Sequence, residues 1–275
     1  MNYYGINTND KSLQHHGVLG MKWGVRRYQN KDGSLTKAGE LRYYEESSRL
    51  IVTNNDGSKT IPKGFKFNRV GKSTIDVNES GGLYVSYGKE DAARYVKNLG
   101  PTPIAKLLGR SGEAVQHISV KSSLKMPSDA SNNLILINSL YNNKKMLRKF
   151  NDSIYSAAVT GSFDKVVDEK MLKNAMKNPS SKEAHKLAYG ISSTLADPNY
   201  VQESKVIYSQ FRKAGYDAIP DTHDRLSGTS ETAMIILNPD KVELTSSTTI
   251  TKDMMKSTKK YVKNLEKLKT SELIS

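Results

Sequence analysis

The sequence contains no cysteine. Disulfide bonds, a thiolate nucleophile and cysteine-ligated zinc or iron–sulfur sites are therefore excluded. It also lacks any apolar run approaching the roughly 20 residues that a membrane span needs, and its mean hydropathy is −0.60. The first ten residues, MNYYGINTND, show no basic stretch followed by an apolar one. We therefore expect a soluble chain that has no signal peptide, no membrane partner and a cytoplasmic origin.

Histidine is scarce, with five residues in 275. His15 and His16 are adjacent, but His117, His185 and His223 follow at no spacing that is typical of a zinc site. A metal centre is therefore not expected.

Acidic residues are outnumbered by basic ones, 28 against 42, which gives a formal charge of +14. Such an excess favours polyanionic surroundings such as nucleic acid or an acidic protein. Residues 1–45 carry +3, residues 251–275 carry +4 and the middle carries the rest, so the charge is spread out. A dedicated nucleic-acid groove would concentrate it and interleave aromatic rings. We therefore expect at most non-specific contact with nucleic acid.

Three regions differ in pattern. Residues 1–45 are rich in Gly, Asn, Lys and Tyr and indicate a flexible tag, with a turn at Asp32-Gly33 and a helix starting near Leu35. Residues 46–250 have the mixed periodicity of a folded domain. Residues 251–275 predict a basic helix, because apolar side chains recur four and three apart from Met254 to Leu268. This helix could pair with a partner helix or bind a membrane surface, but docking on the domain or a solvated tail is favoured.

The middle region predicts an α+β fold. β-rich segments indicate strands at 65–70, 83–87, 115–120, 216–219, 234–237 and 242–244. Residues 90–96 predict a helix with acidic residues in its first turn. Residues 130–214 are predicted to be mostly helical, with breaks near Gly161, Pro179 and Pro198 and a stop at Gly215. Strands followed by a helical insert and further strands imply that the N-terminal and C-terminal strands meet.

Residues 15–28 read HHGVLGMKWGVRRY, and a turn and Leu35-Thr36 follow. This stretch closely resembles a short segment found in proteins of Firmicutes phages and prophages, where it precedes different downstream domains. The resemblance implies a shared addressing role. Residues 13–43 would then bind a capsid or other virion protein, and the protein would be located in the virion, in the bacterial host cytoplasm, or in both.

Three stretches of the middle region resemble an ADP-ribosyltransferase-like domain, over residues 61–250. They are 61–70 with its Asn-Arg-Val, 82–86 with Asp91 and Tyr95, and 215–219 running on to Glu231 and residues 235–239. The resemblance implies a split β-sheet core with a helical insert, and NAD as the substrate. It implies an NAD-dependent transferase, toxin-like in setting, that modifies a host macromolecule.

The resemblance assigns catalytic roles to Arg69, Ser86 and Glu231. An arginine fork pairs with a pyrophosphate bidentately, which suits Arg69. The hydroxyl of Ser86 would brace the site, and Tyr84 or Tyr87 would stack on the nicotinamide ring. The carboxylate of Glu231 would hold a ribose hydroxyl and stabilise the oxocarbenium-like charge as nicotinamide leaves.

The sequence departs from the family pattern in two places. Tyr87-Gly88 follows Ser86 where better known members have a Ser-Thr-Ser-like run, and Glu231 has no second glutamate two residues away. The target of the transfer therefore stays open, as does activity itself. In a purely structural interpretation, Arg69 is a strand-edge cation, Ser86 a buried hydroxyl satisfied by backbone and Glu231 a solvated loop carboxylate.

Two other functions compete with the transferase. In a non-enzymatic virion protein the same fold would be an interaction module, and Arg69, Ser86 and Glu231 would not converge. In a nuclease, the polar cluster of Asp217, Asp221, His223 and Asp224 would bind magnesium, although no arrangement of acidic residues requires it. The cluster could instead line the NAD cleft, but we favour a simple turn, in which Asp is common.

Overall fold

The chain divides into two units, Met1–Tyr43 and Tyr44–Ser275. The computed structural model describes residues 50–72, 77, 79–103, 112–162, 165–226, 230 and 232–272, all of which belong to the second unit. The tag, including the helix expected from Leu35, therefore lies outside the described residues.

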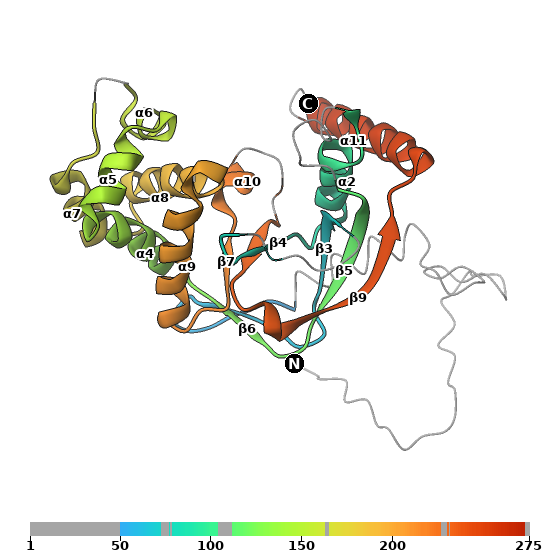
Figure 1. Ribbon diagram of the computed structural model, residues 1–275, viewed down its shortest axis with the longest axis horizontal. Helices are drawn as coiled ribbons and strands as arrows, with labels where there is room; N and C mark the ends of the chain where they lie inside the picture. Colours follow the sequence, from blue (N-terminus) through green and yellow to red (C-terminus); the bar gives the residue numbers. More distant parts are fainter. Residues whose placement is uncertain are drawn as a thin grey trace, which may run out of the picture. The chain divides into compact units, whose positions relative to one another are not determined.

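The described residues of the second unit form three small antiparallel sheets, and Figure 1 labels several of their strands. The first has the order β1 (Val52–Thr53), β2 (Lys59–Ile61), β6 (Leu124–Met126). The second has the order β3 (Lys66–Gly71), β5 (Ala114–Val120), β9 (Val242–Thr249), and the third β4 (Leu83–Val85), β8 (Met234–Ile236), β7 (Ala218–Pro220). N-terminal strands pair with C-terminal ones, β5 with β9 and β4 with β8, as the sequence predicts.

Helices fill the interval between β6 and β7. They are α4 (Asp129–Tyr141), α5 (Lys144–Asn151), α6 (Ile154–Thr160), α7 (Glu169–Lys177), α8 (Lys182–Leu195) and α9 (Val201–Lys213), with a 3-10 turn at Pro198–Tyr200. Three breaks fall near Gly161, Pro179 and Pro198 as predicted, and Gly161 adopts a left-handed φ of 76° directly after α6. The breaks at 142–143 and 152–153 contain neither glycine nor proline and were not predicted. Side chains of Ser128, Asn143, Asp168 and Ser181 cap the helices that follow them. The sequence therefore predicts the helical insert well.

Apolar packing joins the insert to the third sheet. Ile207 and Phe211 of α9 are fully buried in the same core as Ile219 of β7, Ile235 of β8 and Leu237, which directly follows β8. A second core, which includes Phe67 and Ile118, fills the space among the sheets. Burying one such side chain contributes about 1.5–3 kcal/mol. The strands and the helices are thus parts of one folded unit.

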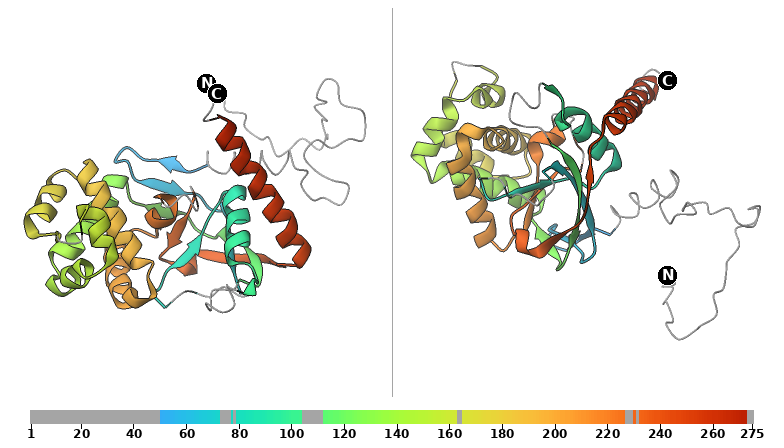
Figure 2. Two further views of the ribbon diagram at one scale, coloured as in Figure 1. Left: turned by 90° about the horizontal axis from the view of Figure 1, so that it is seen from above. Right: turned by 45° about the vertical axis from the view of Figure 1, so that its right-hand side comes forward.

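Helix α11 (Lys252–Glu272) packs against α2 (Lys89–Leu99), as Figure 2 shows. Met254 and Met255 contact a small core that contains Val96 and Ile250. This supports the docked alternative for the C-terminal helix over its described length. Within the described residues, no helix combines the length and apolar character that a bilayer crossing requires.

Four elements escape prediction. Strands β1, β2 and β6 are two or three residues long, too short for an alternating pattern to be visible. Helix α10 (Thr222–Leu226) occupies the stretch that the sequence suggested was a turn. The strand expected at 83–87 stops at Val85.

Candidate functional site

The second and third sheets meet at one pair of residues, Asn68 of β3 and Ser86 just beyond β4. The Asn68 amide donates to the Ser86 carbonyl at 2.6 Å, and the Ser86 amide donates back at 2.9 Å. The pair thus places Ser86 and Arg69, the residue after Asn68 in β3, at the junction of the two sheets. The junction therefore brings together two of the residues that the sequence singled out.

A cavity of about 210 Å³ opens at this junction. Arg69, Ser86 and Tyr84 all line it. The other lining residues are Asn68, Val70, Val85, Tyr95, Leu99, Asp221 and Asp224. Tyr87 is not among them, because its ring packs edge-on against Phe65, 5.5 Å between centroids. The expected stacking role of Tyr87 on a nicotinamide ring therefore has no support in the geometry.

Neighbouring backbone and side chains position the guanidinium of Arg69. Its Nη1 donates to Oε1 of Gln116 at 3.1 Å, and the fully buried Gln116 donates in turn to the carbonyl of Lys72 at 2.7 Å. A Cβ atom at Gly71 would lie only 2.6 Å from Nη1 of Arg69. Glycine at position 71 therefore lets the guanidinium lie across the strand end.

Ser86 is the residue whose environment points most directly to a ligand. Its side chain is 1% exposed, and Oγ has no hydrogen-bond partner among the described residues. The purely structural interpretation, in which backbone groups satisfy this hydroxyl, is therefore not what the structure contains. A buried hydroxyl without a partner costs about 1–3 kcal/mol, so this group is suited to bind a polar ligand atom.

Two tyrosines and two carboxylates are also among the residues that line the cavity. The hydroxyl of Tyr95 donates to the carboxylate of Asp224. Burial, followed by the charge of Asp224, raises the pKa of Tyr95 well above its ordinary value of 10. Tyr95 thus stays a protonated donor at any physiological pH. The hydroxyl of Tyr84 lies 3.0 Å from that of Tyr208, a side chain with no exposed surface.

The interpretation of 217–224 as a turn is wrong for two of its members. Asp224 of α10 and Asp221, which directly precedes this helix, both line the cavity. His223 is directed elsewhere: its Nδ1 lies 3.0 Å from Oγ of Ser193, and its ring stacks on Tyr189. His223 and Asp224 are neighbours in α10, yet their side chains contact different parts of the molecule. A helix of five residues is too short for a periodic pattern in the sequence to predict these directions.

Asp217 is a structural carboxylate. It is 6% exposed and accepts hydrogen bonds from Lys241 Nζ at 2.8 Å and from the Lys125 amide at 3.0 Å. Burial raises the pKa of Asp217, but the hydrogen bonds from Lys241, Lys125 and Asn238 outweigh it and leave the pKa below its ordinary value. The charged form is therefore the one that stabilises the fold.

This predicts a pH-dependent loss of stability in Asp217→Asn. A carboxylate whose pKa is lowered by folding stabilises the protein above its unfolded pKa of about 3.9 and loses that effect as the pH falls through the folded value. We expect Asp217→Asn to cost about 1–3 kcal/mol at pH 7, and much less near pH 3. Urea unfolding at both pH values measures this, with the exposed Asp240→Asn as a control. An equal cost at both pH values would contradict the assignment.

Glu231 lies outside the described residues, but its two neighbours are described. The Ser230 amide donates to the carbonyl of Asp224 at 3.1 Å. The Thr232 amide donates to the carboxylate of Asp91 at 3.0 Å. The chain on either side of Glu231 is therefore attached to α10, which lines the cavity, and to the start of α2.

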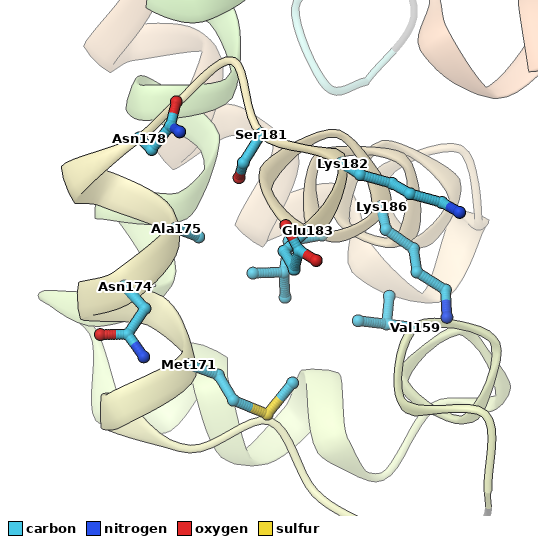
Figure 3. A pocket seen from close by; sticks show the side chains of 10 residues that line it. Val159, Met171, Asn174, Ala175, Asn178, Ser181, Lys182, Glu183 and Lys186 are labelled. Carbon is cyan, nitrogen blue, oxygen red and sulfur yellow. The ribbon is translucent and has the colours of Figure 1, made fainter.

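A larger cavity of about 650 Å³ lies between α7 and α8 (Figure 3). Its apolar lining residues include Val159 and Leu187. Figure 3 shows the polar side chains of Asn174, Glu183 and Lys186 around it. Its polar lining side chains are solvent-exposed or half-exposed, and none of the predicted site residues reaches it. The described residues contain no group of three or more metal-ligating side chains.

Comparison with known proteins gives one match. A family model described as a family of unknown function (DUF7211) matches residues 7–30, which include the HHGVLGMKWGVRRY segment. No curated protein and no solved structure shows a match to the chain.

Proposed function

We propose that this chain transfers ADP-ribose from NAD to a host macromolecule. The observation that carries the proposal is the shared cavity of Arg69 and Ser86, which come from different sheets and lie 17 positions apart in the chain. A non-enzymatic interaction module has no requirement for an arginine fork and an unpartnered buried hydroxyl in one cavity. An enzyme that binds a phosphorylated substrate with many hydroxyl groups needs both of these groups in one cavity.

The strand arrangement supports an ADP-ribosyltransferase-like core. Two three-stranded antiparallel sheets meet at the pair formed by Asn68 and Ser86, and a helical insert separates β6 from β7. This is compatible with the split sheet that the resemblance implies. Fold likeness alone does not carry an activity, so the argument depends on the cavity.

The cavity is suited to one end of NAD. Ligand pockets usually measure about 300–1,000 Å³, so a cavity of about 210 Å³ is suited to the nicotinamide ribose, while the pyrophosphate lies toward Arg69. The hydroxyl of Ser86 would bind a polar atom of the nicotinamide ribose, and the ring of Tyr84 would face the nicotinamide. The positive charge on that ring is compatible with the carboxylates of Asp221 and Asp224.

The reaction is a substitution at the ribose. The bond between ribose C1′ and the nicotinamide nitrogen breaks, and its electron pair leaves with nicotinamide. Positive charge then develops on the ribose, where the carboxylate of Glu231 would stabilise it. A nucleophilic atom of the acceptor forms the new bond to C1′ and releases a proton to water.

The setting that we propose is a phage particle and its bacterial host. The support is the segment at 15–28 with its resemblance to phage and prophage proteins. In this proposal residues 13–43 bind a capsid or other virion protein, and the basic surface makes non-specific contacts with nucleic acid. A tagged enzyme would enter the host cytoplasm with the particle.

Arg69→Lys tests the role of the guanidinium. Lysine keeps the charge but loses the bidentate fork, and a hydrogen bond to a charged group is worth about 1.5–3 kcal/mol. We expect kcat/KM for NAD to fall about 10- to 100-fold. The assay follows NAD consumption by the purified chain and labelling of host lysate by a tagged NAD analogue. Arg148→Lys, an exposed arginine of α5, is the matched control.

Absence of NAD consumption and of labelling in lysate would refute the enzyme. The non-enzymatic virion protein would then be the better account. If both arginine variants kept full activity, the chain would use NAD without Arg69, and the assignment of that residue would fail.

A further inference from the structure

The outer face of α11 carries a row of lysines. At 3.6 residues per turn, five exposed lysines of this helix fall within an arc of about 100°. They are Lys252, Lys256, Lys259, Lys260 and Lys263. We call them the lysine face. The row is about 17 Å long, because each residue adds about 1.5 Å along the helix axis.

The opposite face of α11 is already occupied. Met254 and Met255 contact the small core that contains Val96. Val262, two turns after Met255, is 1% exposed. A helix that binds a bilayer surface or a partner helix needs a free apolar face. The exposed side chains described for α11 are all polar or charged. Docking on α2 therefore leaves charge and hydrogen bonding as the means by which this helix can bind a partner.

Repulsion within the lysine face works against the helix. Three of its pairs are four residues apart, 252 with 256, 256 with 260 and 259 with 263, and like charges at this spacing destabilise a helix. Lys252 also lies in the first turn, where the helix dipole disfavours a positive charge.

Neighbouring acidic groups offset little of this repulsion. Among the exposed residues described for α11 only Asp253 is acidic, and no ion pair joins the five lysines to a described residue. Interspersed charges of both signs would give solubility without repulsion. A partner with negative charge therefore explains the row better than solubility does.

We propose that the lysine face binds the phosphate backbone of a nucleic-acid duplex. Duplex DNA carries one negative charge per about 1.7 Å of axis, so about ten phosphate charges span the length of the lysine face. Lysine ammonium groups bind phosphates as point charges and read no base sequence. The non-specific contact with nucleic acid that the net charge suggests is thereby assigned to one face.

The exposed side chains of α11 favour a duplex over a single strand. A single-stranded site would present aromatic rings on which bases stack, and none of the exposed side chains described for α11 is aromatic. The inference does not depend on the transferase activity, because no residue of the lysine face lines the cavity of Arg69 and Ser86.

The test measures binding of the full chain to a short labelled DNA duplex by fluorescence anisotropy at several salt concentrations. The lysine-face variant combines Lys256→Gln, Lys259→Gln, Lys260→Gln and Lys263→Gln. Each lysine that contacts a phosphate contributes about 0.9 to the slope of log K against log salt concentration. We expect the slope to become shallower by about 3 to 4, and the affinity at about 0.1 M salt to fall at least about 100-fold.

The matched control removes the same charge from the helical insert. It combines Lys145→Gln, Lys170→Gln, Lys177→Gln and Lys205→Gln, at exposed positions of α5, α7 and α9. It should keep the affinity within about threefold, since charges more than about 10 Å away are largely screened at about 0.1 M salt. Both variants should unfold at no lower temperature than the unchanged chain, because the lysine-face variant loses only like-charge repulsion.

Three outcomes would overturn the inference. Equal losses in the two variants would show that binding follows the net charge and not this face. A chain that leaves the duplex unbound at about 0.1 M salt would exclude the partner. Vesicles of phosphatidylcholine and phosphatidylserine provide the third, if the chain binds them through these lysines and does not bind the duplex. The NAD assay decides the transferase separately, so either proposal can fail while the other stands.

Discussion

Glu231→Gln is expected to lower the turnover of NAD by about 1,000-fold, the upper range for removing one preorganised group that stabilises transition-state charge. Glutamine keeps the size and the hydrogen-bonding oxygen but removes the negative charge that would offset the developing oxocarbenium. The loss should therefore appear in kcat and much less in KM. Quantifying nicotinamide release under saturating NAD measures it.

The control for this variant is Glu243→Gln, which makes the same change at an exposed position of β9. It should keep full turnover. Equal activity in Glu231→Gln and the unchanged chain would remove Glu231 from the reaction. Asp221 and Asp224, whose carboxylates belong to residues that line the cavity, would then be the next to test.

Phe211→Ala is expected to destabilise the second unit by about 3–5 kcal/mol, the usual cost of truncating a fully buried phenylalanine. Phe211 lies in the core that α9 shares with Ile219, Ile235 and Leu237. The alanine leaves a cavity at the boundary between helices and strands. For a unit of this size the melting temperature should fall by about 6–20 °C.

Val206→Ala is the matched control, because Val206 belongs to the same helix and is 42% exposed. Thermal unfolding followed by circular dichroism should place this variant within about 1 kcal/mol of the unchanged chain, since surface substitutions usually have small effects. A large loss in Val206→Ala, or none in Phe211→Ala, would contradict the shared core.

Long patterns of residues made most of the fold predictable. The sequence predicts a helical segment that stops at Gly215, and the structure places α9 at Val201–Lys213. The alternation around Phe67 predicts β3. Strands of two or three residues such as β1 carry no periodicity, and tertiary pairing rather than local propensity makes them extended.

The sequence predicted those residues of the candidate site whose side chains have a recognised catalytic or binding role in the family that the chain resembles. Arg69, Ser86 and Tyr84 were chosen by resemblance and lie in one cavity. The interpretation of Asp221 and Asp224 as parts of a simple turn was wrong, because a helix of five residues follows Asp221 and is too short to leave a periodic pattern in the sequence. The hydrogen bonds that the amides of Tyr87 and Gly88 donate to Oγ1 of Thr232 were not predicted either, since they depend on tertiary structure and leave no local pattern.

The helical insert begins and ends at the same place. The Asp217 amide donates to the carbonyl of Lys125 at 2.8 Å, and the Lys125 amide donates to the carboxylate of Asp217 at 3.0 Å. Because the two ends of the helical insert are hydrogen-bonded to each other, the insert can change in length without altering the strands that precede and follow it. Evolution can therefore exchange or resize this module while the residues around Ser86 keep their geometry. A replacement would have to cover Ile219, Ile235 and Leu237 with apolar side chains.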